Sequence, residues 1–246
     1  MICSICGQEI HGQYYYDYWK NTFCMHHYQQ GEVVTCSSCS AMVHKDTVLN
    51  LPDGRCLCSS CQAQVISQPE QVDKLKRIVV RKLVDEGVRY KDKYLESVPV
   101  KIVDVQELAR LRNQAPNVNN KGITVTQGIT SIIGSLVGCS PILSHKVYIL
   151  NNLIKIEFAG TLAHELLHVW QNENQIKLAP PQCEGLCNLG SWLIYTTMTA
   201  SRAPYFVKAL MESPDPIYGD GFRYVHGVYE KYGWEGVLER AKKGCL

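Results

Sequence analysis

Hydrophobic residues recur at helical spacing in two separate parts of the chain. In residues 70–86 they occupy one face, Lys and Arg fill the other, and Gly87 ends the pattern. Residues 156–170 repeat the spacing with a broader apolar face. The apolar positions are Val72, Leu75, Val79 and Leu83 in the first part and Phe158, Leu162, Leu166, Val169 and Trp170 in the second. This spacing predicts an amphipathic helix in each part.

Other patterns predict two more helices and several strands. The pair Pro180-Pro181 starts a segment that is expected to be helical to about residue 199. Asp104 is placed to cap a short helix that ends near Arg112. Runs typical of strands lie at residues 98–103, 122–127 and 145–151. Strands and helices mixed in this order predict an α+β fold.

Cysteine is unusually frequent, with 12 residues in a chain of 246, and eight of them lie before residue 62. No signal peptide is expected, because Met1 is followed by neither a basic start nor an apolar core. No apolar run approaches the ~20 residues that span a bilayer. We therefore expect a cytoplasmic protein without membrane association. Disulfides are rare in that compartment, so the cysteines are expected to bind metal.

The spacing of these cysteines predicts two zinc sites with four ligands each. The first set is Cys3, Cys6, Cys24 and His27, and the second is Cys36, Cys39, Cys58 and Cys61. His26 competes with His27, and Cys56 competes with Cys58, but a gap of two residues selects the second of each. Sites closed by four protein ligands are structural and fold segments that have little core of their own. Residues 1–66 are thus expected to form a β-rich module around two structural Zn²⁺ ions.

The second amphipathic helix carries the sequence His164-Glu165-Leu166-Leu167-His168. H-E-x-x-H on a helix places two imidazoles one turn apart on one face, with a carboxylate between them. That geometry suits two ligands of a catalytic zinc and a base for the water that zinc activates. We therefore predict that His164 and His168 bind Zn²⁺ and that Glu165 is the general base.

A catalytic zinc commonly has three protein ligands, and Glu184, in the next predicted helix, is the best candidate for the third. Cys183 and Cys187 flank it, so a thiolate is an alternative ligand. We favour Glu184 because hydrolytic His-His-Glu sites are common.

A hydrogen-bond donor is also needed for the oxyanion that forms during hydrolysis. The candidates lie downstream of the predicted ligands, at Tyr224, His226 and Tyr229.

Charge gives no sign of a nucleic-acid partner. The net charge is +2, and residues 1–66 hold only Lys20, Lys45 and Arg55 as basic residues. Binding phosphates without a basic patch is unfavourable. The aromatic run Tyr14-Tyr15-Tyr16 is therefore expected to be a strand that packs the first finger, the segment around the first zinc site, and not a surface for stacking bases.

The two fingers resemble a LIM domain, including the ending D-G-R-C-L-C-S-S-C. They depart from it in two ways. Cys24 precedes His27, whereas a LIM domain commonly has His before Cys in its second pair. Eight residues separate His27 from Cys36, whereas two are usual.

The fingers, T-L-A-H-E-L-L-H-V-W, C-E-G-L-C-N-L-G-S-W-L, Y-G-D-G-F-R and K-Y-G-W-E-G-V-L together resemble the LIM-linked peptidases of the DA-one family. These are growth-restricting proteases of plants, with shorter bacterial relatives. The resemblance implies a zincin-like, minimal gluzincin metallopeptidase domain at residues 98–246, joined to the fingers by a helical linker at 67–97. It places Asn188 where a residue orients a ligand histidine. Family members commonly have Glu where this chain has Cys183. We find no motif like those by which the plant members bind ubiquitin.

These features predict a zinc-dependent endopeptidase with one catalytic and two structural Zn²⁺ ions. Its substrate is a protein or peptide, and residues 147–150 are a candidate strand for pairing with it. The fingers are expected to recruit a protein partner or to regulate the enzyme. The alternative is a LIM-type scaffold whose peptidase domain is vestigial.

Overall fold

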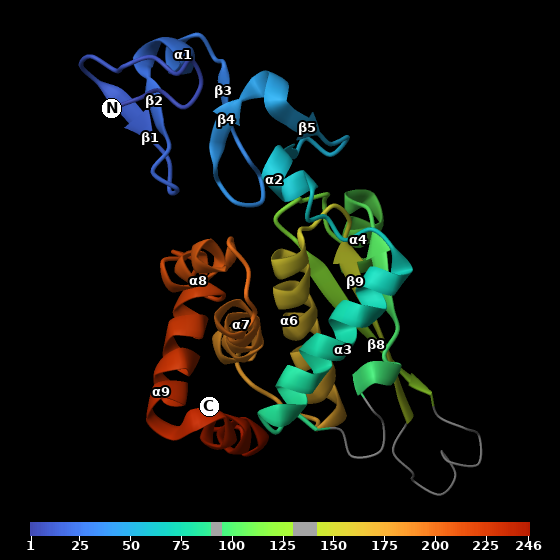
Figure 1. Ribbon diagram of the computed structural model, residues 1–246. Helices are drawn as coiled ribbons and strands as arrows, with labels where there is room; N and C mark the ends of the chain where they lie inside the picture. Colours follow the sequence, from blue (N-terminus) through green and yellow to red (C-terminus); the bar gives the residue numbers. More distant parts are fainter. Residues whose placement is uncertain (90–94, 130–141) are drawn as a thin grey trace, which may run out of the picture. The chain divides into compact units, whose positions relative to one another are not determined.

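A computed structural model of the protein describes residues 1–89, 95–129 and 142–246 (Figure 1). These residues form two compact units, one of residues 1–65 with 152–155 and one of residues 66–151 with 156–246. The fold is α+β, with small sheets in both units. The described part of the chain contains no helix that is both long and apolar enough to cross a membrane.

The smaller unit consists of three antiparallel pairs of short strands. Its elements are β1 (Tyr14–Tyr16), β2 (Thr22–Cys24), α1 (Met25–Gln29), β3 (Val33–Thr35), β4 (Met42–His44), β5 (Val48–Asn50), β6 (Cys56–Cys58) and α2 (Ser59–Gln62), with a 3₁₀ turn at Lys45–Thr47. The expected aromatic strand is β1, but only its middle residue packs inward. The Tyr15 ring stacks on Tyr28 at 3.8 Å, whereas Tyr16 is 70% exposed. Successive residues of a strand face opposite sides, which explains the difference.

The larger unit contains a three-stranded sheet and most of the helices. Its elements are α3 (Pro69–Asp85), a 3₁₀ turn (Leu95–Ser97), β7 (Val100–Val103), α4 (Val105–Arg112), β8 (Gly122–Ile129), β9 (Ile142–Leu150), α6 (Lys155–Glu173), α7 (Pro180–Thr197), α8 (Ala203–Met211) and α9 (Gly219–Lys242). The predicted helices and strands of this unit all formed within a few residues of their expected bounds. Asp104 caps α4 as expected, since its carboxylate accepts from the backbone N–H of Glu107 at 2.8 Å.

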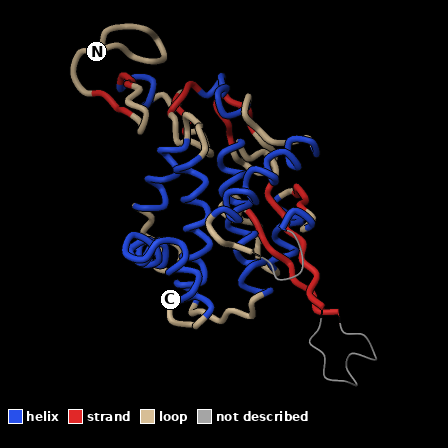
Figure 2. Tube along the Cα trace, turned by 60° about the horizontal axis from the view of Figure 1, so that its bottom comes forward, coloured by secondary structure: helices blue, strands red, loops and turns tan. Residues whose placement is uncertain are grey.

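Strand β9 lies in the centre of this sheet, parallel to β7 and antiparallel to β8. Figure 2 shows β8 and β9 as two long strands side by side. Val147 is therefore paired on both sides, with Val100 and with Thr124. The prediction that residues 147–150 receive a substrate strand is wrong, because their backbone groups already bond to two neighbours. Strands β7 and β8 are the two edges of this sheet within the described residues.

Helix α3 forms at the expected place. Its four apolar positions, Val72, Leu75, Val79 and Leu83, are all buried. The side chains of Gln68 and Gln71 cap its start, and Gly87 follows its end with a φ of +90°. Although its segment was expected to be a linker, α3 belongs to the larger unit and packs against α7.

The helices of the larger unit approach one another closely at glycines. A Cβ on Gly160 of α6 would meet the ring of Tyr195 on α7. A Cβ on Gly185 of α7 would meet the carbonyl of Gly221 on α9. The hydroxyl of Ser191 donates to the carbonyl of Gly160 at 2.9 Å. These contacts bring α6 and α7 together, which decides the geometry of the site described next.

Candidate metal centres

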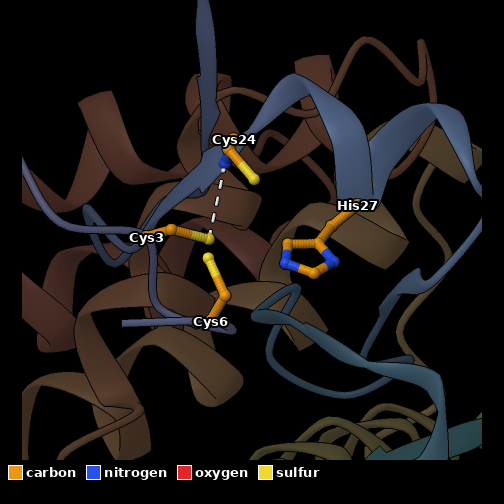
Figure 3. A group of neighbouring side chains, drawn as sticks. All are labelled: Cys3, Cys6, Cys24 and His27. Carbon is orange, nitrogen blue, oxygen red and sulfur yellow. Dashed lines mark hydrogen bonds between the residues drawn. The ribbon is translucent and has the colours of Figure 1, made fainter. Parts of the chain in front are cut away.

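The first finger brings its four expected ligands together, as Figure 3 shows. One ligand atom from each of Cys3, Cys6, Cys24 and His27 lies within 4.8 Å of the others. His26 is not part of this group. The carboxylate of Glu32 lies 2.6 Å from Nδ1 of His27, so Nδ1 carries the proton and Nε2 presents its lone pair. Burial opposes ionisation of Cys3, but the backbone N–H groups of its neighbours outweigh burial and lower its pKa to about 6.

The second finger gathers the sulfurs of Cys36, Cys39, Cys58 and Cys61, and all four residues are buried. The sulfurs of Cys39 and Cys58 are 3.9 Å apart. Zinc–sulfur bonds of about 2.3 Å in a tetrahedron separate the sulfurs by about 3.8 Å. The hydrogen bond with Cys36 raises the pKa of Cys39 to about 12, so the four thiols cannot all ionise without a cation. The group therefore fits zinc.

Cys56 lies outside this group, although it is only two residues from Cys58. Its sulfur donates to the carbonyl of Thr35 at 3.1 Å. Cys56 is therefore not available as a ligand in this arrangement.

Both fingers hold their first cysteine in the same backbone turn, because the N–H groups of Gly7 and Ser40 each donate to the carbonyl of a cysteine four residues earlier. This repeated turn positions the ligand pair in each finger.

A third cluster lies in the larger unit, where α6 and α7 meet. Oε2 of Glu184 is 3.1 Å from Nε2 of His164 and 3.5 Å from Nε2 of His168. Three ligands at about 2.1 Å from a tetrahedral zinc would be about 3.4 Å apart. The two distances from Glu184 therefore match the spacing of ligands on one metal ion.

Hydrogen bonds behind the two imidazoles fix which ring nitrogen faces Glu184. Asn188 donates from Nδ2 to the carbonyl of Tyr218 at 2.9 Å, which turns its Oδ1 toward Nδ1 of His164 at 3.0 Å. An amide oxygen only accepts, so Nδ1 of His164 carries the proton. Gln171 arranges His168 in the same way. Its Nε2 donates to the carbonyl of Cys183, and its Oε1 lies 3.1 Å from Nδ1 of His168.

Two imidazole lone pairs and one carboxylate oxygen therefore point at a common place. Oε2 of Glu184 is buried and makes no well-aligned hydrogen bond within the described residues. Burial opposes its charge, but attraction to the two imidazoles in their protonated form outweighs burial and holds its pKa well below the usual range. Burial also lowers the pKa of His168, yet its contacts with Cys187, Cys183 and Glu184 raise that pKa well above its usual value. The surroundings thus favour a cation, and the donor set fits zinc.

Cys187 also has its sulfur within 4.8 Å of a ligand atom from each histidine. Its sulfur lies 3.4 Å from Nδ1 of His168, which is the nitrogen that faces Gln171 and not the one that faces Glu184. Burial raises the pKa of the Cys187 thiol to about 12, which disfavours the thiolate that zinc needs. Glu184 is therefore the better third ligand.

Glu165 is buried beside this cluster, 4% exposed, and is held by strand β8. The Thr124 hydroxyl lies 2.8 Å from Oε2 of Glu165 and 2.9 Å from its backbone carbonyl. A Cβ on Gly122 would lie 2.7 Å from Oε1 of the same carboxylate, so the strand can approach only because that position is glycine. Sequence reasoning missed both residues, although a glycine that starts a strand is a sign of close approach.

A cleft of about 330 Å³ opens over these residues. Its walls include Ile123 and Thr124 of β8, Arg112 of α4, Asn172 of α6 and Tyr218 before α9. A second cavity of about 490 Å³ shares Arg112, His164, Glu165 and Tyr218 with it.

The three expected oxyanion donors do not line either cavity. Tyr224 is 53% exposed on α9, and His226 is buried with its ring packed on Trp192 and Phe222. The side chain of Tyr229 contacts the Trp192 ring. The structure brings Tyr218 to the cleft instead, with its ring 6.4 Å from that of His164. Tyr218 occupies the turn just before α9, whereas the three candidates follow it inside the helix.

Comparison with known proteins finds two distant relatives. The chain is 22% identical to protein DA1-related 1 of Arabidopsis thaliana over 92% of its own length and 50% of the relative. It is also 22% identical to LIM domain-containing protein HDR3 of Oryza sativa subsp. japonica over 92% of its own length and 56% of the relative. The chain thus spans about half the length of these relatives. No family model and no solved structure matches the chain. These matches support a LIM- and DA1-like family at a distance.

Proposed function

We propose that this protein is a zinc-dependent endopeptidase with a LIM-type module and a zincin-like catalytic domain. The observation that carries the proposal is the meeting of His164, His168 and Glu184 beside the buried carboxylate of Glu165, in residues that line one cleft. Three protein ligands leave a tetrahedral zinc one position for water, which is the arrangement of hydrolytic sites. The resemblance to the DA-one peptidases supports the same conclusion.

The three ligands would hold the zinc, which supplies Lewis acidity and lowers the pKa of water to about 7. Glu165 accepts the proton that this water loses. Thr124 holds Oε2 by a 2.8 Å hydrogen bond, so Oε1 is the atom available to take it. Glu165 then delivers the proton to the leaving nitrogen of the substrate.

Tyr218 is placed to donate to the substrate oxyanion. Burial is the largest cause that raises the pKa of Tyr218, and the nearby Glu184 adds to it, so the phenol keeps its proton near neutral pH. Arg112 lies near Tyr218, where its charge opposes this rise in the pKa, and it donates to the carbonyl of Gly122 at 2.8 Å. Arg112 thus links helix α4 to the strand that holds Glu165.

Strand β8 offers the edge along which an extended substrate can lie. It lines the cleft through Ile123 and Thr124, and it is paired only with β9 in the described sheet. A chain added to such an edge makes backbone hydrogen bonds that do not depend on sequence. We therefore expect substrate to pair with β8 and not with residues 147–150. We propose that the LIM-type module recruits a protein partner.

The proposal is tested by incubating the zinc-loaded full chain with a panel of unfolded proteins and sequencing the products. Internal cleavage that a chelator abolishes and zinc restores is expected. Intact substrates under all conditions would contradict the proposal and favour a scaffold with a vestigial site.

His168→Ala should remove one zinc ion and leave the fingers loaded. We expect about three zinc ions per chain in the parent protein and about two in the variant, because only the cleft site loses a ligand. Elemental analysis of dialysed protein measures both values. His11→Ala is the control, since His11 is exposed and outside every cluster. Equal zinc content in His168→Ala and the parent would contradict the assignment of His168.

Gly122→Ala should displace the catalytic base without removing zinc. The new methyl would lie 2.7 Å from Oε1 and 2.9 Å from Cγ of Glu165, so the carboxylate must move. Misplacing a catalytic group by about 1 Å can cost about 100-fold in rate, and we expect kcat/KM to fall at least tenfold. Gly227→Ala is the matched control, because its Cβ would meet nothing within 4 Å. A kcat/KM in Gly122→Ala equal to that in Gly227→Ala would show that the position of the Glu165 carboxylate does not depend on Gly122.

A further inference from the structure

A chain of hydrogen bonds runs from α6 through the sheet and back to a residue that lines the cleft. Nε2 of His145 lies 2.7 Å from Oε1 of Glu173, and Nδ1 of His145 lies 2.9 Å from the hydroxyl of Thr126. Nδ2 of Asn172 donates to the same hydroxyl oxygen at 2.9 Å. His145 is 7% exposed, although it takes no part in the chemistry proposed above.

The direction of each hydrogen bond follows from the chemistry of the groups. The carboxylate of Glu173 can only accept, so Nε2 of His145 donates to it. When that is the only proton on the ring, Nδ1 of His145 accepts the hydroxyl proton of Thr126. The oxygen of Thr126 in turn accepts from the NH₂ end of the Asn172 amide.

The carbonyl end of that amide is therefore turned away from Thr126. Asn172 is an exposed residue that lines the cleft, and no donor to its Oδ1 is found within the part of the chain that the structure describes. It follows His168 by four residues, which is about 6 Å along the helix. One wall of the cleft thus presents a fixed hydrogen-bond acceptor about one helical turn from the candidate zinc ligands.

We infer that Asn172 is a substrate-positioning residue whose Oδ1 accepts a backbone N–H of the bound polypeptide, and that Glu173, His145 and Thr126 act through it. The inference rests on the proposed function for the nature of the ligand. A strand advances about 3.3 Å per residue, so the N–H lies about two residues from the bond that is cut. Recognition of a backbone group fits an enzyme that accepts many sequences.

These hydrogen bonds are better explained by a role in presenting Oδ1 of Asn172 than by a purely structural link between β8 and α6. A structural link would need only the contact of Thr126 with α6. The orientation of the Asn172 amide would then have no consequence. Polar groups that hydrogen-bond to one another hold one geometry, and here that geometry sets the orientation of an exposed amide that lines the cleft.

The test measures binding apart from hydrolysis. Unstructured peptides are titrated by calorimetry into the zinc-loaded Glu165→Gln protein, alone and combined with Asn172→Ala. Loss of one neutral hydrogen bond should weaken binding about three- to tenfold. In active protein, Asn172→Ala should raise KM by a similar factor and leave kcat unchanged. Asn174→Ala is the matched control, because its amide bonds to the carbonyl of Trp170 and it does not line the cleft.

A scan of N-methylated peptides then locates the contact. Methylation removes one backbone N–H at a time, and at one position it should weaken binding to the parent site but not to the Asn172→Ala site. Thr126→Val should behave like Asn172→Ala, and Thr126→Ser, which keeps the hydroxyl, should behave like the parent. Equal methylation penalties in both proteins at every position would overturn the inference. Peptides that bind with this dependence but are never cut would instead leave the inference standing and refute the peptidase.

Discussion

Glu165→Gln should lower the rate of peptide hydrolysis by about 10²–10⁴-fold, which is the usual contribution of a general base. The amide keeps the shape of the carboxylate and its hydrogen bond from Thr124, but it cannot accept the proton of the attacking water. Glu165 is not one of the three atoms that meet at the zinc position, so the zinc content should stay unchanged.

The measurement combines kcat/KM on a peptide found by product sequencing with elemental analysis of the same sample. Glu235→Gln on α9 is the matched control, because Glu235 is exposed and lines neither cavity at the cluster. Hydrolysis at the parent rate in Glu165→Gln would refute the role of Glu165. A variant that loses both activity and zinc would show that Glu165 supports the metal and would also contradict the proposed role.

The positions of the candidate ligands were predictable because each depends on local periodicity. A spacing of four residues on a helix puts His164 and His168 on one face whatever the rest of the fold does. Glu184 was predicted from its place early in the next helix, and the structure brings its Oε2 within 3.5 Å of both imidazoles. The cysteine pairs of the fingers follow the same rule, since a gap of two residues suits one turn around an ion.

The partners of Glu165 could not be predicted, because they reach the site through tertiary packing. Thr124 and Gly122 belong to a strand that lies about forty residues earlier in the chain. Their local sequence does not indicate which carboxylate they contact. The oxyanion donor failed for a related reason. The chain has 14 tyrosines, and local sequence does not tell which of them faces the cleft.

The sheet order was equally hidden from the sequence. Each strand was recognisable from its composition, but β9 pairs in parallel with β7, about 45 residues away in the chain, and that pairing makes β9 central. Pairings between distant strands are decided by the packing of the whole domain. The prediction of an edge strand at residues 147–150 depended on this order and therefore failed. Helix α9 was also missed; its backbone is non-helical at Gly233, with a φ of +64°, so it consists of two helical parts joined by a kink.

Cys58→Ser should unfold the second finger, whereas Cys56→Ser should not. Both cysteines lie on β6, but only Cys58 is among the four buried sulfurs, and Cys56 donates to a backbone carbonyl. The binding of structural zinc is worth about 10–16 kcal/mol in small fingers and drives their folding. Hydrogen exchange of the full chain should therefore show loss of protection across residues 33–65 and one zinc fewer in Cys58→Ser alone. The larger unit should keep its protection, because its core of buried residues does not include the finger. Retained protection in Cys58→Ser would mean that the finger folds through its apolar contacts without zinc. An equal loss of protection in both variants would mean that the substitutions disrupt strand β6 and not metal binding.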